Sequence, residues 1–202
     1  MIVQGVSIGD MLNQSVAVLT KPSVQSFEQF ERRGGQREGL IYVGVAAALA
    51  GIVGALFGLL TGGVGGLIGG LVIGIVGPLL NFFVFSFLVY TIGKSQGGTG
   101  TQDEVFYTTS LYTAPILAVS GIVNAIPLLN CLLLPATFVL GLYQLYLGYL
   151  ATRSSMNLDQ NKAIITVVLS IIAMWIAGAI LTFVLAAIGL SAAAASGALS
   201  SP

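Results

Sequence analysis

Five long apolar stretches alternate with short polar segments along this chain of 202 residues. All seven basic and all seven acidic residues lie in the polar segments 1–38, 93–104 and 152–162. A helix needs about 20 apolar residues to cross a hydrocarbon core of about 30 Å. We therefore predict an all-α integral membrane bundle of five transmembrane helices, over residues 39–60, 67–92, 104–125, 128–151 and 163–190.

The segment before the first stretch carries a weaker, amphipathic pattern. Its apolar residues recur at helical spacing: Met11, Leu12, Val16 and Leu19, then Val24, Phe27 and Phe30. Pro22 suits the first turn of a helix, and Gly34–Gly35 is a stop signal. The pattern in residues 1–38 therefore predicts one or two amphipathic helices that lie at the membrane interface with their phenylalanines toward lipid. The alternative is an arm that packs on the loops.

Small residues occupy every fourth position through the first two stretches. The series is Ala46, Ala50, Gly54, Gly58, Gly62, Gly66, Gly70 and Gly74. Because lipid provides no hydrophobic drive between helices, close backbone approach at small residues is a main source of their association. We predict a helix-packing seam, either between the two spans, which residues 61–66 join as a tight hairpin, or against a second copy. The alternative is that glycine is simply common in membrane helices.

Lysine and arginine indicate the orientation. The segments 1–38, 93–103 and 152–162 hold four, one and two of them, and the opposite loops hold none. Short cytoplasmic loops carry the excess of basic residues. Residues 1–38 are therefore expected to be a cytoplasmic arm, and the uncharged segment 191–202 a tail on the non-cytoplasmic side.

Composition narrows the possible chemistry. The chain is 56% hydrophobic and 7% charged, with a mean hydropathy of +0.99 and a net charge of zero, so it lacks the basic stripe that nucleic acid requires. It has no histidine and no acidic or basic residue inside the apolar stretches, and its single cysteine, Cys131, is expected to be a packing residue. Membrane proteases and proton-coupled transporters depend on such groups. We expect no enzymatic activity, no cofactor and no metal site.

Polar residues enrich the third and fourth stretches. They are Thr108, Thr109, Ser110, Tyr112, Thr113, Ser120 and Asn124, then Asn130, Thr137, Tyr143, Gln144, Tyr146 and Tyr149. Polar groups in a membrane tend to face protein, although Tyr149 also suits an aromatic belt. Pro115 is expected to kink the third span, and Pro127 to lie in the turn that follows it. Thr101 and Glu104 have the spacing of a capping box before that span.

Several of these features together resemble the Yip family. They are Lys21-Pro22, Gly97-Gly98-Thr99-Gly100-Thr101, Tyr107, Tyr112, Ala114-Pro115, Ile126-Pro127, the tyrosine-rich span from Gln144 to Tyr149, and Lys162-Ala163. The resemblance implies a five-span protein with a cytosolic N-terminus that acts through protein partners. The arm before the first span is shorter than in eukaryotic members, which argues against binding of a Rab GTPase. We expect a prokaryotic member in the plasma membrane.

Two function classes follow. The first is a non-enzymatic scaffold or adaptor that contacts the bilayer and forms homo-oligomers or binds other membrane proteins, without nucleic acid. The second is a channel or transporter for a neutral or lipidic substrate, lined by the polar residues of the third and fourth spans. The absence of intramembrane charge favours the scaffold.

Overall fold

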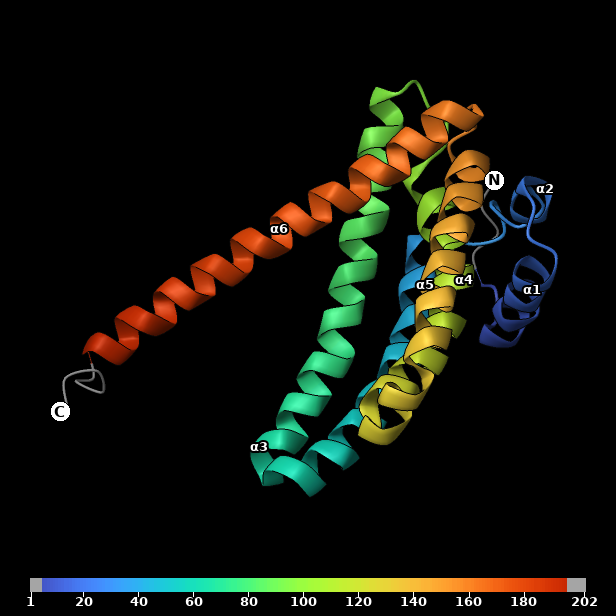
Figure 1. Cartoon of the computed structure of the whole chain (residues 1–202). Coiled ribbons are helices and arrows are strands. Elements are labelled where there is room, and N and C mark those ends of the chain that lie inside the picture. Colours follow the sequence, from blue (N-terminus) through green and yellow to red (C-terminus); the bar gives the residue numbers. More distant parts are fainter. Residues whose placement is uncertain (1–4, 196–202) are drawn as a thin grey trace.

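Six helices make up the part of the chain, residues 5–195, that the computed structural model describes (Figure 1). They are α1 (Ile8–Thr20), α2 (Val24–Glu28), α3 (Gln36–Ser95), α4 (Gln102–Ala125), α5 (Pro127–Ser155) and α6 (Gln160–Ala195). Ser7 and Asp10 form a capping box at the start of α1, and Thr101 and Glu104 form one at the start of α4. The second of these confirms the capping box predicted from the sequence.

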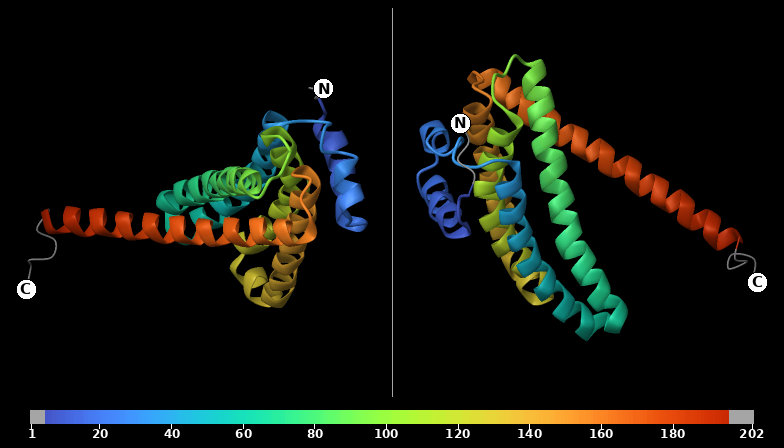
Figure 2. Two further views of the ribbon diagram at one scale, coloured as in Figure 1. Left: turned by 90° about the horizontal axis from the view of Figure 1, so that it is seen from above. Right: turned by 180° about the vertical axis from the view of Figure 1, so that it is seen from behind.

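The long helix α3 is bent sharply at two glycines. Gly62 and Gly63 have non-helical backbone angles, and Gly63 has a φ of +59°, a conformation that glycine adopts without steric cost. Beyond the bend the chain turns back, so the two halves of α3 lie side by side (Figures 1 and 2). The hairpin predicted at residues 61–66 is therefore present, with its irregular backbone confined to two residues.

Four helices of the described chain are long and apolar enough to cross a membrane: Gln36–Ser95, Gln102–Ala125, Leu128–Ser155 and Gln160–Ile180. The first contains both of the first two predicted spans, because α3 continues through its bend. A straight helix of this length would extend about 90 Å, three times the thickness of a hydrocarbon core. The bend at Gly62–Gly63 divides this length into two shorter halves.

The connections gather at two opposite ends of the bundle (Figure 1). The α3–α4 and α5–α6 loops lie at one end, near α2, and we call this the polar end because it holds the charged segments. The bend of α3 and the junction of α4 with α5 lie at the other. At that junction Ile126 is extended and α5 begins at Pro127, so Pro127 is the first residue of the helix rather than part of a turn.

A core of aromatic and small residues joins α4 to both halves of α3. Phe82 and Phe106 meet edge to face with ring centroids 5.7 Å apart. On the other side, a Cβ at Gly39 would lie 3.0 Å from the carbonyl oxygen of Phe106. Pro115 lies inside α4, which stays helical from Gln102 to Ala125.

The N-terminal helices pack on the bundle rather than lying apart from it. Phe27 of α2 is completely buried, and its ring meets Tyr112 of α4 edge to face at 6.4 Å. The prediction that this phenylalanine faces lipid was wrong, because the ring fills space between α4 and α5. The apolar residues of α1 divide between two faces: Met11 and Val18 are buried, whereas Ile8, Leu12 and Val16 point outward.

Helix α6 leaves the bundle after its first turns. Ala163, Thr166, Val167 and Ser170 are buried against α3 and α5, and beyond them Trp175 and Ile176 are exposed. Figure 2 shows α6 extending away from the other helices in both views. The helix continues to Ala195, so it includes the start of the predicted tail, and residues 196–202 lie outside the described part of the chain.

Candidate functional site

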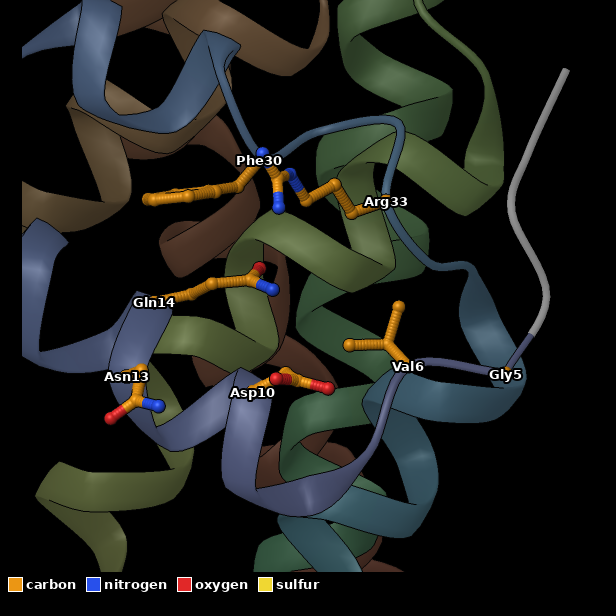
Figure 3. Close-up of a pocket in the computed structure, with 7 residues that line it drawn as sticks. All are labelled: Gly5, Val6, Asp10, Asn13, Gln14, Phe30 and Arg33. Atoms are coloured by element: carbon orange, nitrogen blue, oxygen red, sulfur yellow. The ribbon is translucent and has the colours of Figure 1, made fainter.

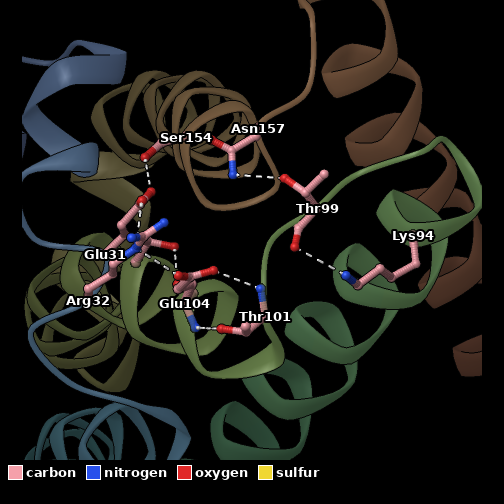
Figure 4. A network of polar contacts seen from close by, with 9 residues as sticks. Glu31, Arg32, Lys94, Thr99, Thr101, Glu104, Ser154 and Asn157 are labelled. Carbon is pink, nitrogen blue, oxygen red and sulfur yellow. Dashed lines mark hydrogen bonds and ion pairs between the residues drawn. The ribbon is translucent and has the colours of Figure 1, made fainter. Parts of the chain in front are cut away.

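All three charged segments meet at the polar end of the bundle (Figure 4). Glu31 and Arg32 come from the arm, Glu104 lies in the first turn of α4, Ser154 lies in the last turn of α5, and Asn157 belongs to the connection between α5 and α6. These residues are far apart in sequence, with 72 positions between Arg32 and Glu104 and 123 between Glu31 and Ser154. The sequence predicted that the three charged segments lie on one side of the membrane. The structure brings them together at one end of the bundle.

Two buried carboxylates share one arginine at the centre of this end. Arg32 Nε donates to Glu104 Oε1 at 3.1 Å and lies 3.7 Å from Glu31 Oε1. Glu104 Oε2 accepts from the backbone N–H of Thr101 at 2.7 Å, and Ser154 Oγ donates to Glu31 Oε2 at 3.0 Å. Glu31 and Glu104 are 7% and 8% exposed, so water solvates both carboxylates poorly. Arg32 is the one cation that pairs with them.

Burial and the neighbouring charges together shift the pKa of Glu31. Burial is the largest influence and raises the pKa of the Glu31 carboxyl above its usual value. The Ser154 hydroxyl and the Arg32 guanidinium lower the pKa, whereas the neighbouring carboxylates Glu104 and Glu28 raise it. The docked arm therefore holds a carboxylate that takes up a proton more readily than a free glutamate does.

A glycine-rich loop closes the polar end against the α5–α6 connection. Gly97 has a left-handed backbone, with φ +91°, and a Cβ at Gly100 would overlap the carbonyl oxygen of Ser155. Between them, the Thr99 N–H donates to the carbonyl oxygen of Met156 at 3.0 Å. Asn157 Nδ2 donates to Thr99 Oγ1 at 3.1 Å. The glycines thus allow two loops to pack backbone against backbone.

The family-resemblance positions fall into separate places. Gly97, Gly98, Gly100 and Lys162 lie together at the polar end, where Lys162 Nζ would be 3.9 Å from a Cβ on Gly97. Pro22 lies between α1 and α2, Tyr112 and Pro115 lie within α4, and Pro127 lies at the opposite end. They do not form one site.

A cavity lies beside the arm (Figure 3). Its volume is about 610 Å³, and its lining is Gly5, Val6, Asp10, Asn13, Gln14, Phe30 and Arg33. Arg33 lies over the Phe30 ring, with its guanidinium carbon 5.5 Å from the centroid. Opposite it, Gln14 accepts a hydrogen bond from the Tyr107 hydroxyl at 2.9 Å, which anchors α1 to α4. The cavity therefore lies beside a hydrogen bond between α1 and α4 and has an exposed cation in its lining.

The small-residue series lies between the two halves of α3. Cβ atoms at Gly58 and Gly66 would each overlap the other residue's carbonyl oxygen, and a Cβ at Gly70 would lie 2.5 Å from the Gly54 carbonyl oxygen. A Cβ at Gly74 would lie 2.6 Å from Cα of Gly51, a residue outside the series. Gly62 is at the bend and has open space around it. Among the two arrangements open from the sequence, the chain adopts packing within itself.

Polar residues of α4 and α5 divide into packed and cavity-lining groups. Thr108 and Ser110 are buried and donate to carbonyl oxygens of their own helix. Thr113, Ser120 and Gln144 instead line cavities on the side of the bundle. No group of three or more histidine, cysteine, aspartate or glutamate residues that could hold a metal ion occurs within residues 5–195.

Comparison with known families identifies the family of this chain. The sequence model of the Yip1 domain matches residues 16–181, which include the last five residues of α1, all of α2 to α5, and α6 as far as residue 181. The chain belongs to the Yip family. No curated protein and no solved structure matches it significantly. The Yip domain and the apolar helices make this a multi-pass membrane protein.

Sequence reasoning missed the partners of the polar end in this Yip protein. Glu31, Ser154 and Met156 drew no attention because each is ordinary in its own segment. The one local signal was the Thr101–Glu104 capping box, which identified Glu104 as a helix cap and gave no hint of Arg32. Contacts across such sequence separations depend on how the helices pack.

Proposed function

We propose that this Yip protein is a non-enzymatic membrane scaffold that presents its polar end to protein partners. In this proposal α3 crosses the bilayer twice and the whole chain five times. The arm and the polar end face the cytoplasm of a prokaryotic plasma membrane, and the C-terminus faces the other side. Partners are further copies of the chain or other membrane proteins.

One observation carries the proposal, which is the convergence of all charged segments into a single fixed surface. Hydrogen bonds link the arm to α4 and α5 through Glu31, Arg32 and Gln14. Phe27 packs against Tyr112 of α4, and the Tyr143 hydroxyl donates to the Leu19 carbonyl oxygen at 2.5 Å. These two contacts also fix the arm to the helices. A surface that is already ordered binds a partner without the entropic cost of ordering it.

The arm cavity provides a specific point of contact on that surface. Arg33 is exposed and forms no ion pair within the described residues, and Phe30 supports its guanidinium from one side. Arginine and aromatic residues are enriched among the residues that dominate protein interfaces. An acidic side chain of a partner would pair with Arg33 and enter the arm cavity.

Crosslinking in native membranes followed by mass spectrometry tests the proposal. We expect partner peptides to be joined to the arm and to residues 94–104, and Arg33→Ala to reduce their recovery at least several-fold. Lys21→Ala removes a comparable exposed cation of the same arm, outside the cavity, and should leave recovery unchanged.

Two results would overturn the scaffold proposal. The first is equal loss of partners in both variants, which would show that only the overall charge matters. The second is passage of ions or small solutes through liposomes that contain the purified protein, above that of empty liposomes. The second result would establish the transport alternative.

A further inference from the structure

Three adjoining cavities form one groove along the side of the helix bundle. The first, about 250 Å³, lies among the second half of α3, α4, α5 and α6, and the second, about 300 Å³, shares Asn81, Thr113 and Gln144 with it. The third, about 390 Å³, shares Pro78, Leu117 and Ser120 with the second. We call these three adjoining cavities together the lateral groove.

The lateral groove contains two side-chain amides that the protein itself leaves unused. Asn81 and Gln144 form no side-chain hydrogen bond to any described residue, and Thr113, whose side chain is hydrogen-bonded to Tyr112, lines the same two cavities. This differs from the hydroxyl groups of Thr108, Ser110 and Thr137, which donate to their own helix. The two amides each offer a donor pair and an acceptor.

The two amides lie well below the tyrosines that mark the polar end of each helix. At 1.5 Å per residue, Asn81 is about 14 Å along α3 from Tyr90, and Gln144 about 8 Å along α5 from Tyr149. In a core about 30 Å thick, this depth belongs to the acyl chains of one leaflet. Water cannot satisfy the amides there, and leaving such a group unpaired in an apolar medium is unfavourable.

No charged residue lines any of the three cavities. A phosphate or carboxylate bound at this depth would have no counter-charge, and an isolated ionised group in an apolar medium is strongly disfavoured. The ligand's polar part must therefore be uncharged. It must also both donate and accept hydrogen bonds to satisfy the two amides.

The remaining walls suit hydrocarbon chains. Phe85, Leu145 and Trp175 line the first cavity, and Trp175 is 78% exposed where α6 departs from the bundle. Leu117 and Ile73 line the continuation toward the opposite end. A molecule can therefore enter sideways from the bilayer and lie with its apolar part along the groove.

We propose that the lateral groove binds an uncharged lipid of the diacylglycerol class. Its hydroxyl and ester carbonyl groups would pair with Asn81 and Gln144, and its acyl chains would extend past Leu117 and Trp175. This site is independent of the polar end and goes beyond the scaffold role.

Photocrosslinking in reconstituted vesicles tests the proposal. A photoactivatable diacylglycerol is incorporated beside the full chain, and the label on the protein is quantified and located by mass spectrometry. We expect labelled peptides from α3, α4 and α5 around the groove. The double variant Asn81→Leu, Gln144→Met keeps the side-chain sizes and removes the amides, and it should lower labelling about tenfold. Asn130→Leu changes an exposed amide of α5 outside the groove and should not.

A second variant tests the site by shape instead of polarity. Gly141 lines the first cavity and has open space where a Cβ would stand, so Gly141→Leu fills the cavity without displacing backbone. It should abolish labelling while the melting temperature in detergent stays unchanged. The photoactivatable phosphatidic acid with the same chains should label the groove at least tenfold less than the diacylglycerol.

Equal labelling of the wild-type chain and both groove variants would overturn the proposal, as would equal labelling by the phosphatidic acid. Either result would leave the scaffold proposal untouched, because partner crosslinking at the polar end is measured separately.

Discussion

Gly58 and Gly66 face each other across the two halves of α3 so closely that neither has room for a side chain. A Cβ on either would overlap the carbonyl oxygen of the other. The bend at Gly62–Gly63 lies midway between them, which places residues at equal distances from the bend in contact. The same relation pairs Gly54 with Gly70, where a Cβ on Gly54 would lie 3.5 Å from the Gly70 carbonyl oxygen.

Gly70→Leu is expected to destabilise the hairpin. Its Cβ would lie 2.5 Å from the Gly54 carbonyl oxygen, so the halves must separate, at a cost of about 1 to 3 kcal/mol. For a chain of this length the melting temperature in detergent should fall by about 2 to 10 °C. Gly65→Leu is the matched control, because nothing lies within 4 Å of its Cβ position. Equal melting temperatures for the two variants would contradict the packing described.

Phe27→Ala should release the arm from the bundle. The ring is fully buried against Tyr112, and deleting a buried phenylalanine side chain costs about 3 to 5 kcal/mol. Because the ring joins α2 to helices that have many other contacts, amide hydrogen exchange should accelerate more in α1 and α2 than in α4. Val16→Ala removes an exposed apolar group from the same arm and should leave exchange near that of the wild type. Uniform acceleration through all helices would argue against a local role.

The docking of the arm should weaken as pH rises. Burial raises the pKa of Glu31 in the folded chain, so the folded state holds the proton more tightly than the unfolded state. This contribution to stability is complete below the unfolded pKa and is lost as pH rises through the higher folded value.

Glu31→Gln tests that pH dependence. An amide keeps an oxygen to accept the hydrogen bond from Ser154 and carries no charge, so arm protection in hydrogen exchange should become less dependent on pH between about 4 and 7. Glu28→Gln, at an exposed position of the same arm, removes only the weakest influence on the pKa of Glu31 and should change the pH dependence far less than Glu31→Gln does. A Glu31→Gln profile that follows the wild type would show that another group is responsible.

Single cysteines should report two crossings by α3. In a Cys131→Ser background, Arg37→Cys and Lys162→Cys should react with a membrane-impermeant maleimide from the same side, in inverted vesicles if that side is cytoplasmic. Thr61→Cys, beside the bend, should react only from the other side. Labelling of position 61 from the side that labels position 37 would mean that α3 re-enters the membrane without crossing it.

Much of this architecture was open to prediction because it depends on local physics. Ionised side chains are excluded from hydrocarbon, so the positions of charges alone separate the apolar helices from the polar segments. Helix starts follow from short-range capping, as Thr101 and Glu104 show. The seam at Gly58 and Gly70 was visible because small residues repeat at the spacing of a helix face.

Sequence alone therefore determined that the chain is helical, that it belongs in a membrane and that its charges share one end. Tertiary structure decided that the glycine seam closes within one chain, that Phe27 turns inward to Tyr112 and that Arg32 reaches Glu104. It also decided which polar residues are satisfied by their own helix and which, like Asn81 and Gln144, line a groove. The reason is that these outcomes depend on which helix faces meet, and that choice is made by contacts between residues dozens of positions apart.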